Sequence, residues 1–305
     1  MTDTAGGASP LGAAREGVAV EWPTLGVLAG CYAVWGGGLF LPLWLAIPAV
    51  AVAAALHSSL THEAIHGHPT RWPLLNALLL LPPLTLFIPY LRFKDQHLAH
   101  HQDEILTDPY DDPESNFLDP AVWARLSAPM QALLRFNNTL GGRILVGPAL
   151  GLWTFLAGDI RAIRHGDRRA ALGWVLHLPG LALTLAMVAA APMPLWAYLV
   201  AVYLAFGLLK IRTFLEHRAH EKARGRTVVI EDRGPLAFLF LNNNLHVVHH
   251  MHPRVAWYRL PALYRARADH YLARNDGYRY ASYAEVFRRH FLRAKDPVPH
   301  PLWPR

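Results

Sequence analysis

Histidine is concentrated in short clusters along this chain. Eighteen of its 305 residues are histidine, and most of them lie in four groups. Two of these groups, HLAHH and HVVHH, share the spacing HxxHH, and a third contains HEAIH. A neutral imidazole nitrogen is a good ligand for zinc, copper, iron and nickel. The clusters therefore predict a site for transition metals.

The spacing within each cluster suits a helix that presents ligands to two metal ions. Residues at i, i+3 and i+4 project from one face of a helix. In HxxHH the first histidine shares a face with each of the last two, which diverge by about 100° around the helix axis. Such a triplet can supply ligands to two neighbouring ions. Eight histidines carry this prediction: His62, His66, His97, His100, His101, His246, His249 and His250.

Two other classes of metal site compete for the same residues. HEAIH, from His62 to His66, has the H-E-x-x-H form of zinc peptidases, in which Glu63 would be the base. A zinc site needs only three protein ligands, so it leaves both HxxHH triplets unexplained. Soluble di-iron bundles use paired Glu-x-x-His motifs, which this chain lacks. A histidine-dominated pair of metals is therefore favoured, and an intramembrane zinc peptidase is the alternative.

The elements that must position these histidines are apolar helices. The chain is 53% hydrophobic and 17% charged, whereas about a quarter of residues are charged in ordinary soluble domains. Residues 22–62 and 170–209 contain no Asp, Glu, Lys or Arg. Each block can hold two membrane spans of roughly 20 residues. Helix-breaking glycine and proline place the turns near 36–42 and 191–195.

Two further apolar stretches are either interrupted by prolines or too short to be simple spans. Residues 72–91 are long enough for one span, but the pair Pro82 and Pro83 interrupts helical hydrogen bonding. A bent hairpin, an interfacial segment and a straight span are therefore all open. Residues 144–157 are too short to span and are expected to lie at the interface or against the bundle.

The distribution of charge predicts the orientation and the overall organisation. Lys and Arg are absent from the tight turns, which is the positive-inside pattern and places both termini and the metal site on the cytoplasmic side. The fold class is an all-α integral membrane protein with about four transmembrane helices and a cytosolic helical cap that holds the metals. The expected boundaries are a disordered tail at 1–21, one membrane domain at 22–305, spans within 22–62 and 170–215, and a cap from 92–169 and 216–305.

Composition also excludes several function classes. The single cysteine, Cys31, excludes internal disulfides, iron–sulfur clusters and thiolate metal sites. The first 20 residues lack the features of a signal peptide. The net charge of +7 is explained by positive-inside anchors, so no nucleic-acid partner is expected. Basic residues near the boundary are interpreted as such anchors, with a site for an acidic head group as the alternative: Arg92, Lys94, Lys210 and Arg212.

The three histidine clusters resemble the histidine boxes of the membrane-bound fatty acid desaturase and hydroxylase superfamily. HEAIH, HLAHH and HVVHH match HxxxH, HxxHH and HxxHH in order, and the resemblance covers roughly residues 45–265. It implies a four-span bundle under a cytosolic cap, with a di-iron centre between them. It also implies a ninth ligand, His217 in FLEHR, and a polar residue, Asn242, that hydrogen-bonds a ligand or an iron-bound water; a helix cap is the alternative role for Asn242. Four neighbouring histidines stay outside the pattern: His57, His68, His220 and His252.

The resemblance further implies two iron ions, dioxygen as co-substrate, and attack on a C–H bond of a fatty acyl or related lipid. Fatty acid desaturation is the favoured reaction. HHMHPRVAWYRLP also resembles the carotenoid ketolases, so hydroxylation or ketolation and alkene-forming hydrocarbon oxygenation are alternatives. No fused haem-binding or ferredoxin domain is expected, so electrons are expected to come from a separate donor protein. A catalytically idle metal-binding relative is the remaining class, and the intact set of nine histidines argues against it.

Overall fold

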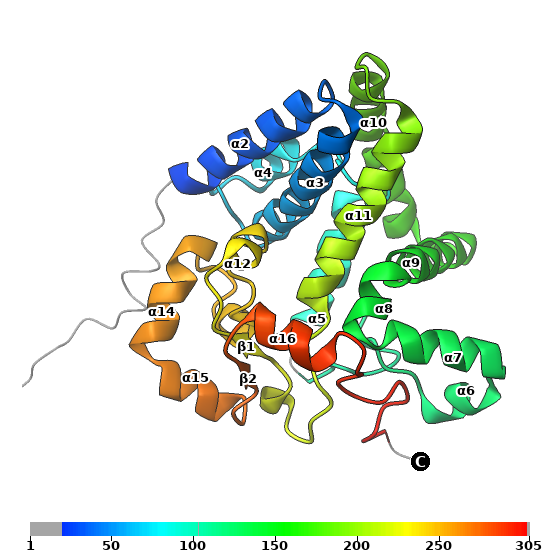
Figure 1. The fold of residues 1–305 in the computed structure, drawn as a ribbon, viewed down its shortest axis with the longest axis vertical. Coiled ribbons are helices and arrows are strands. Elements are labelled where there is room, and N and C mark those ends of the chain that lie inside the picture. The colour runs from blue at the N-terminus through cyan, green and yellow to red at the C-terminus, as the bar shows by residue number, and fades with distance from the viewer. Residues whose placement is uncertain (1–19, 103, 304–305) are drawn as a thin grey trace, which may run out of the picture.

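Two long helical hairpins form the framework of the protein (Figure 1). The computed structural model describes residues 20–102 and 104–303. The first hairpin joins α2 (Trp22–Gly38) to α3 (Leu43–Ile65), and the second joins α10 (Arg168–Ala189) to α11 (Leu195–Thr213). The turns fall in the glycine and proline stretches, which confirms the positions expected from the sequence.

Helices α3 and α11 lie at the centre of this framework. Helix α11 buries Ala197, Ala201 and Ala205 at a spacing of four residues, and small residues let helices approach closely in a membrane. Trp35 Nε1 of α2 donates to Tyr198 Oη at 3.1 Å. The Tyr198 hydroxyl in turn donates to the Leu84 carbonyl at 2.8 Å. These bonds join both hairpins to the segment between them.

Three of the described helices are long and apolar enough to cross a membrane, namely α3, α10 and α11. Helix α10 exposes large apolar side chains, among them Val175, Leu176 and Leu178. Exposed apolar surface of this kind marks a membrane or partner interface. Helix α2 has 17 residues, or about 26 Å at 1.5 Å per residue, against roughly 30 Å for the hydrocarbon core. The fourth span therefore stays a prediction.

Residues 72–91 take the bent path rather than the straight one. Helix α4 (Pro73–Leu79) ends before Pro82, and the chain continues as a loop to α5 (Tyr90–His100). Within the loop, Leu86 has a left-handed backbone with φ of 66°. Its carbonyl accepts a hydrogen bond from His177 Nε2 of α10 at 2.7 Å. The loop is thus held against α10.

Gly180 is the point of closest approach between α10 and this loop. A Cβ at Gly180 would lie 2.1 Å from the Leu81 carbonyl oxygen. Gly180→Ala is therefore expected to lower the free energy of unfolding by about 1–3 kcal/mol, because the loop must move. Thermal unfolding in detergent measures this effect. Gly30→Ala in α2 is the control, since a Cβ there meets nothing within 4 Å; equal destabilisation by both changes would contradict the packing.

The remaining elements surround the C-terminal ends of α3 and α11 (Figure 1). One side is built from α6 (Pro120–Arg125), α7 (Ala128–Asn137), α8 (Leu140–Leu145) and α9 (Gly147–Arg164). The other side contains α12 (Pro235–Leu239), α13 (His246–Met251), α14 (Leu260–Ala266), α15 (Ala268–Arg274), α16 (Tyr283–His290), the short 3-10 helices η1 (Ala223–Gly225) and η2 (Trp257–Arg259), and two parallel strands. The strands are β1 (Val229–Ile230) and β2 (Arg279–Tyr280), with Val229 opposite Arg279.

Two smaller expectations concern the segment 144–157 and the N-terminal tail. Residues 144–157 lie in α8 and α9, and Tyr203 Oη of α11 donates to the Leu145 carbonyl at 2.5 Å. This confirms packing against the bundle. Most of the expected disordered tail, residues 1–19, lies outside the described residues. Glu21, within the expected tail, donates its backbone N–H to the Pro69 carbonyl at 2.8 Å.

Candidate metal centre

Four separate segments bring nine histidine side chains together. Helix α3 carries His62 in its last turn, and His66 follows at its C-cap. Helix α5 likewise carries His97 and His100 in its last turn, with His101 at its C-cap. The third histidine box, His246 to His250, lies within α13. His217 follows the C-terminus of α11.

The nine histidines separate into two groups. In each group, one ring nitrogen of every member lies within 4.8 Å of those of the others. The first group contains His62, His66, His97, His101 and His249, and the second contains His100, His217, His246 and His250. Both HxxHH boxes are divided between the groups. The box on α5 gives its first and last histidines to the first group, and the box on α13 gives its first and last to the second.

The distances between ring nitrogens fit metal ligation. Five Nε2–Nε2 pairs are 2.9 to 3.1 Å apart: His66–His97, His97–His101, His101–His249, His100–His217 and His217–His246. Two nitrogens at adjacent positions of a six-coordinate ion, with bonds of about 2.1 Å, are about 3 Å apart. The spacing thus matches neighbouring ligands of one ion in each group.

Hydrogen bonding alone accounts less well for this arrangement. A neutral imidazole has one N–H, and His97 directs its N–H from Nδ1 to Glu114 Oε1 at 2.9 Å. Its Nε2 therefore offers a lone pair to the group. His62 Nε2 is buried and has no hydrogen-bond partner within the part of the chain that the structure describes. The residues present therefore fit two transition-metal ions bound by nitrogen.

Burial keeps most of these histidines neutral. Desolvation, reinforced by repulsion from neighbouring histidines, holds the pKa values of His217, His246 and His249 well below the usual range. A neutral imidazole is the form that binds a metal. His100 differs, because the carboxylates of Glu114 and Asp112 outweigh burial and raise its pKa to about 9.

Two carboxylates after α5 orient the histidines of that helix. His100 Nδ1 donates to Asp112 Oδ1 at 2.8 Å, just as His97 Nδ1 donates to Glu114. Asp112 is buried and also accepts the Thr107 N–H at 2.9 Å. A carboxylate can only accept, so each bond fixes the ring tautomer and leaves Nε2 free for a metal. Sequence spacing gave no sign of these two residues.

An asparagine and a glutamate perform the same task for the second group. Asn243 Nδ2 donates to Glu216 Oε1 at 3.0 Å, and its Oδ1 accepts from His246 Nδ1 at 3.1 Å. Asn242, the residue chosen from the sequence, instead donates Nδ2 to the Trp257 carbonyl at 3.0 Å. The asparagine in contact with a clustered histidine is thus one position further along the chain.

The histidines beside the boxes have other partners, and none of them belongs to either group. His57 lies 3.2 Å from Tyr32 Oη, His68 lies 2.7 Å from Glu21, His220 lies 3.3 Å from Asp276, and the His252 ring faces that of Tyr271. His252, which follows the third box by two residues, is therefore a natural control for that box.

Glu63 is buried and hydrogen-bonded to the backbone, so its carboxylate does not face an open space beside the histidines. Its Oε2 accepts the Trp257 N–H at 3.2 Å, and the residue is 4% exposed. The base of a zinc peptidase must reach a metal-bound water. Moreover, His62 and His66 share their group with three further histidines, whereas a catalytic zinc uses three protein ligands. The arrangement disfavours the peptidase.

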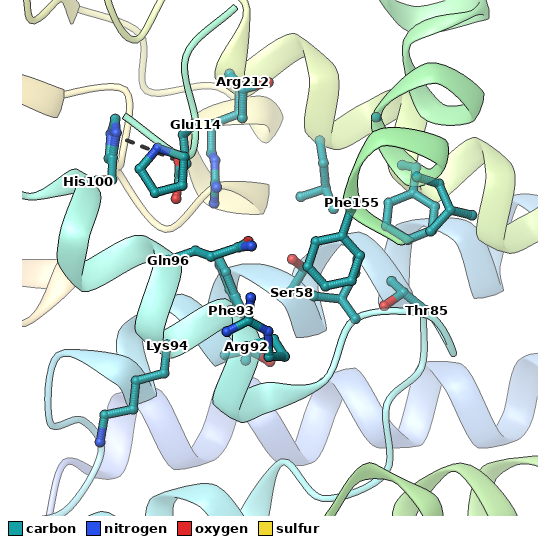
Figure 2. A pocket seen from close by; sticks show the side chains of 18 of the residues that line it. Ser58, Thr85, Arg92, Phe93, Lys94, Gln96, His100, Glu114, Phe155 and Arg212 are labelled. Carbon is teal, nitrogen blue, oxygen red and sulfur yellow. Dashed lines mark ion pairs between the residues drawn. The ribbon is translucent and has the colours of Figure 1, made fainter. Parts of the chain in front are cut away.

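A cavity of about 1000 Å³ lies beside the histidines. His100 and His217 line it together with Glu114 and Glu216. Figure 2 shows His100, Glu114 and Arg212 on one side and Phe155, Ser58 and Thr85 on the other. Much of the remaining wall is apolar and includes Leu74, Leu78, Leu81, Leu152, Leu176 and Phe206. Its volume and lining suit one lipid-sized molecule.

Comparison with known proteins agrees with this geometry. The search of curated proteins found no match to the chain. A family model described as fatty acid desaturase matches residues 23–283. The matched range contains both helical hairpins, both histidine groups and the carboxylates that orient them. The chain therefore belongs to the fatty acid desaturase family.

Proposed function

We propose that this protein is a membrane-bound, non-haem di-iron oxidoreductase that uses dioxygen to desaturate a fatty acyl or related lipid chain. Family membership gives the coarser statement, an oxidoreductase of the desaturase or hydroxylase type. The observation that carries the proposal is the position of two all-histidine groups beside a largely apolar cavity. His100 and His217 line that cavity, so a bound chain would lie next to the second group.

The five-histidine and four-histidine groups would each hold one iron. When bound, the irons would supply dioxygen activation and the removal of hydrogen from an unactivated C–H bond. The protein positions the ligands: Asp112 and Glu114 fix the rings of α5, and Asn243 fixes His246. Ligation by neutral histidine instead of carboxylate leaves the centre with more positive charge, which suits the acceptance of electrons from a separate donor protein.

The cavity wall has two roles in this proposal. Buried or half-buried apolar side chains such as Leu80, Ile88 and Phe206 bind a lipid chain by removing its surface from water. They also keep water away from the reacting carbon, which prevents side reactions. In the proposed orientation the histidines and both termini face the cytoplasm, where a soluble electron donor has access.

The decisive experiment measures metal content, oxygen consumption and product together. Purified protein is expected to contain two irons per chain, one for each group, and to consume dioxygen only when a reductant and a lipid are both present. Chelation should abolish turnover and ferrous iron should restore it. One zinc per chain without iron would overturn the proposal and favour the peptidase.

Mass spectrometry of all lipids in an expressing host then assigns the reaction. Loss of two hydrogens supports desaturation. Gain of one oxygen would instead indicate a hydroxylase or ketolase, and loss of the carboxyl carbon an alkene-forming oxygenase.

A further inference from the structure

Charged side chains gather at the end of the cavity that adjoins the histidines. Four cations and four carboxylates line this region: Arg143, Lys210, Arg212, Lys295, Asp112, Glu114, Glu216 and Asp296. Every carboxylate already has a partner. Asp112 accepts from His100, Glu114 accepts from His97, Glu216 lies 3.2 Å from Arg212, and Asp296 lies 3.2 Å from Lys295. Among the described residues, Arg143 and Lys210 have no carboxylate in ion-pair contact, which leaves two cations unmatched.

The aliphatic parts of these two side chains both lie against Gly147 of α9. A Cβ at Gly147 of α9 would lie 3.1 Å from Arg143 Cδ and 3.5 Å from Lys210 Cγ. A Cβ at Gly151 would lie 3.0 Å from Lys210 Nζ. The two glycines, one helical turn apart, thus leave room for both side chains over α9. A larger residue at Gly151 would displace the ammonium group.

The two cations differ in their hydrogen bonds. Arg143 is 4% exposed and donates only to neutral oxygens, including the Asn137 carbonyl at 3.0 Å and the Asn116 side chain. Lys210 has no hydrogen bond or ion pair within the described part of the chain. Arg143 repels the Lys210 ammonium group, whereas Glu114 and Glu216 attract it without forming an ion pair with it. An anion in direct contact with Lys210 would therefore be stabilised.

Arg212 adds a second free donor to this region. The residue is 7% exposed, and its Nη1 has no hydrogen-bond partner among the residues described. A buried cationic donor without an acceptor is costly. Its Nε lies 3.2 Å from Glu216 Oε1, which lies 3.9 Å from His246 Nδ1. The free donor is therefore close to the second histidine group.

The other two basic residues near the membrane boundary are differently placed. Figure 2 shows Lys94 directed away from His100 and Arg212. Arg92 forms an ion pair with Asp159 at 2.8 Å and donates to it through two nitrogens. Its charge is thus matched. Of the sequence's candidates for an acidic head group, Lys210 and Arg212 are the ones beside the histidines.

We propose that Lys210 and Arg212, with Arg143 behind them, bind the carboxylate of a free fatty acid at the histidine end of the cavity. The acyl chain then runs along Leu80, Ile88 and Phe206. This inference rests on the proposed function and specifies its substrate class. Because the head group is held beside the histidines, the position of attack is set by distance from the carboxyl carbon.

Equilibrium binding to the iron-loaded protein in detergent tests this site without turnover. Labelled dodecanoic acid is expected to bind about tenfold or more tightly than methyl dodecanoate, which has the same chain but no charge. Lys210→Gln should weaken binding of the acid by about tenfold and leave the ester unchanged. Lys222→Gln, at an exposed lysine paired with Asp276, is the control and should change neither. Iron content should be equal in all three proteins.

Several results would overturn the proposal. Equal affinity of the wild-type protein for acid and ester would show that the cavity does not recognise a carboxylate. This comparison needs no variant. Tighter, Lys210-dependent binding of dodecanoyl-CoA than of the acid would assign the cations to phosphate. Arg143→Gln provides a second variant, with the same selective loss expected, should Lys210→Gln fail to fold.

The products separate this inference from the proposed function. Acids of increasing length, from dodecanoic to hexadecanoic, should be modified at a constant distance from the carboxyl carbon. A constant distance from the methyl end would contradict the head-group site and leave the desaturase proposal intact. Charge-dependent binding with no product from any lipid would instead support the head-group site and contradict the desaturase proposal.

Discussion

Replacing His250 by alanine is expected to abolish product formation, with a loss of at least about a thousandfold, while the protein still inserts in the membrane. A thousandfold corresponds to about 4 kcal/mol of transition-state stabilisation. His250 belongs to the smaller group, which retains only three histidines without it. Its ring stacks 4.3 Å from that of His101 in the other group. The change therefore removes a donor from one group and a packing contact from the other.

Product analysis by mass spectrometry and iron content per chain measure this effect. His252→Ala is the matched control, because that residue is two positions away and belongs to neither group. It should retain activity within a few-fold and both irons. Full activity in the His250 variant would show that the third histidine box is not required for the reaction.

Asp112→Asn is expected to weaken iron binding and activity by about 10–100-fold, the range for groups that orient a metal ligand. Asp112 accepts from both His100 Nδ1 and the Thr107 N–H. An asparagine has only one side-chain oxygen, so its NH2 group must face one of these two donors. Either orientation leaves a buried N–H unsatisfied and removes the charge that supports the His100 ring.

The neighbouring residue supplies the control for this prediction. Asp111 is exposed, and Asp111→Asn removes the same charge from the same loop. Competition with a chelator gives the iron affinity of each variant. Wild-type affinity in Asp112→Asn, or equal losses in both variants, would show that the carboxylate does not orient His100.

Composition predicted the helices that frame the site because charge is costly in a membrane. A block of about 40 uncharged residues is therefore expected to form apolar helices, and its glycine and proline residues mark the turn. The same reasoning could not choose the path of residues 72–91, since Pro82 and Pro83 permit more than one. The path of these residues depends on long-range contacts, such as that of Gly180 with the Leu81 carbonyl. The number of spans is likewise not settled by composition.

Eight of the nine clustered histidines could be predicted because their spacing is local, whereas His217 was implied only by the family resemblance. A helix sets the relation between His97, His100 and His101 whatever the rest of the fold does. The residues that orient them depend on loops instead. Thr107 has φ of 69°, in the turn that brings Asp112 back to α5. Leu241 and Asn242 both adopt left-handed backbone, with φ of 49° and 56°, and no spacing rule shows which asparagine then faces His246.

The distribution of the two histidine groups along the chain sets an order for assembly during synthesis. A nascent chain that has reached residue 215 contains four of the five members of the first group, but only His100 of the second. The second group is complete only when the segment from His217 to His250 has left the ribosome and packed against α5. A chain truncated before His246 would therefore keep four members of the first group but only His100 and His217 of the second.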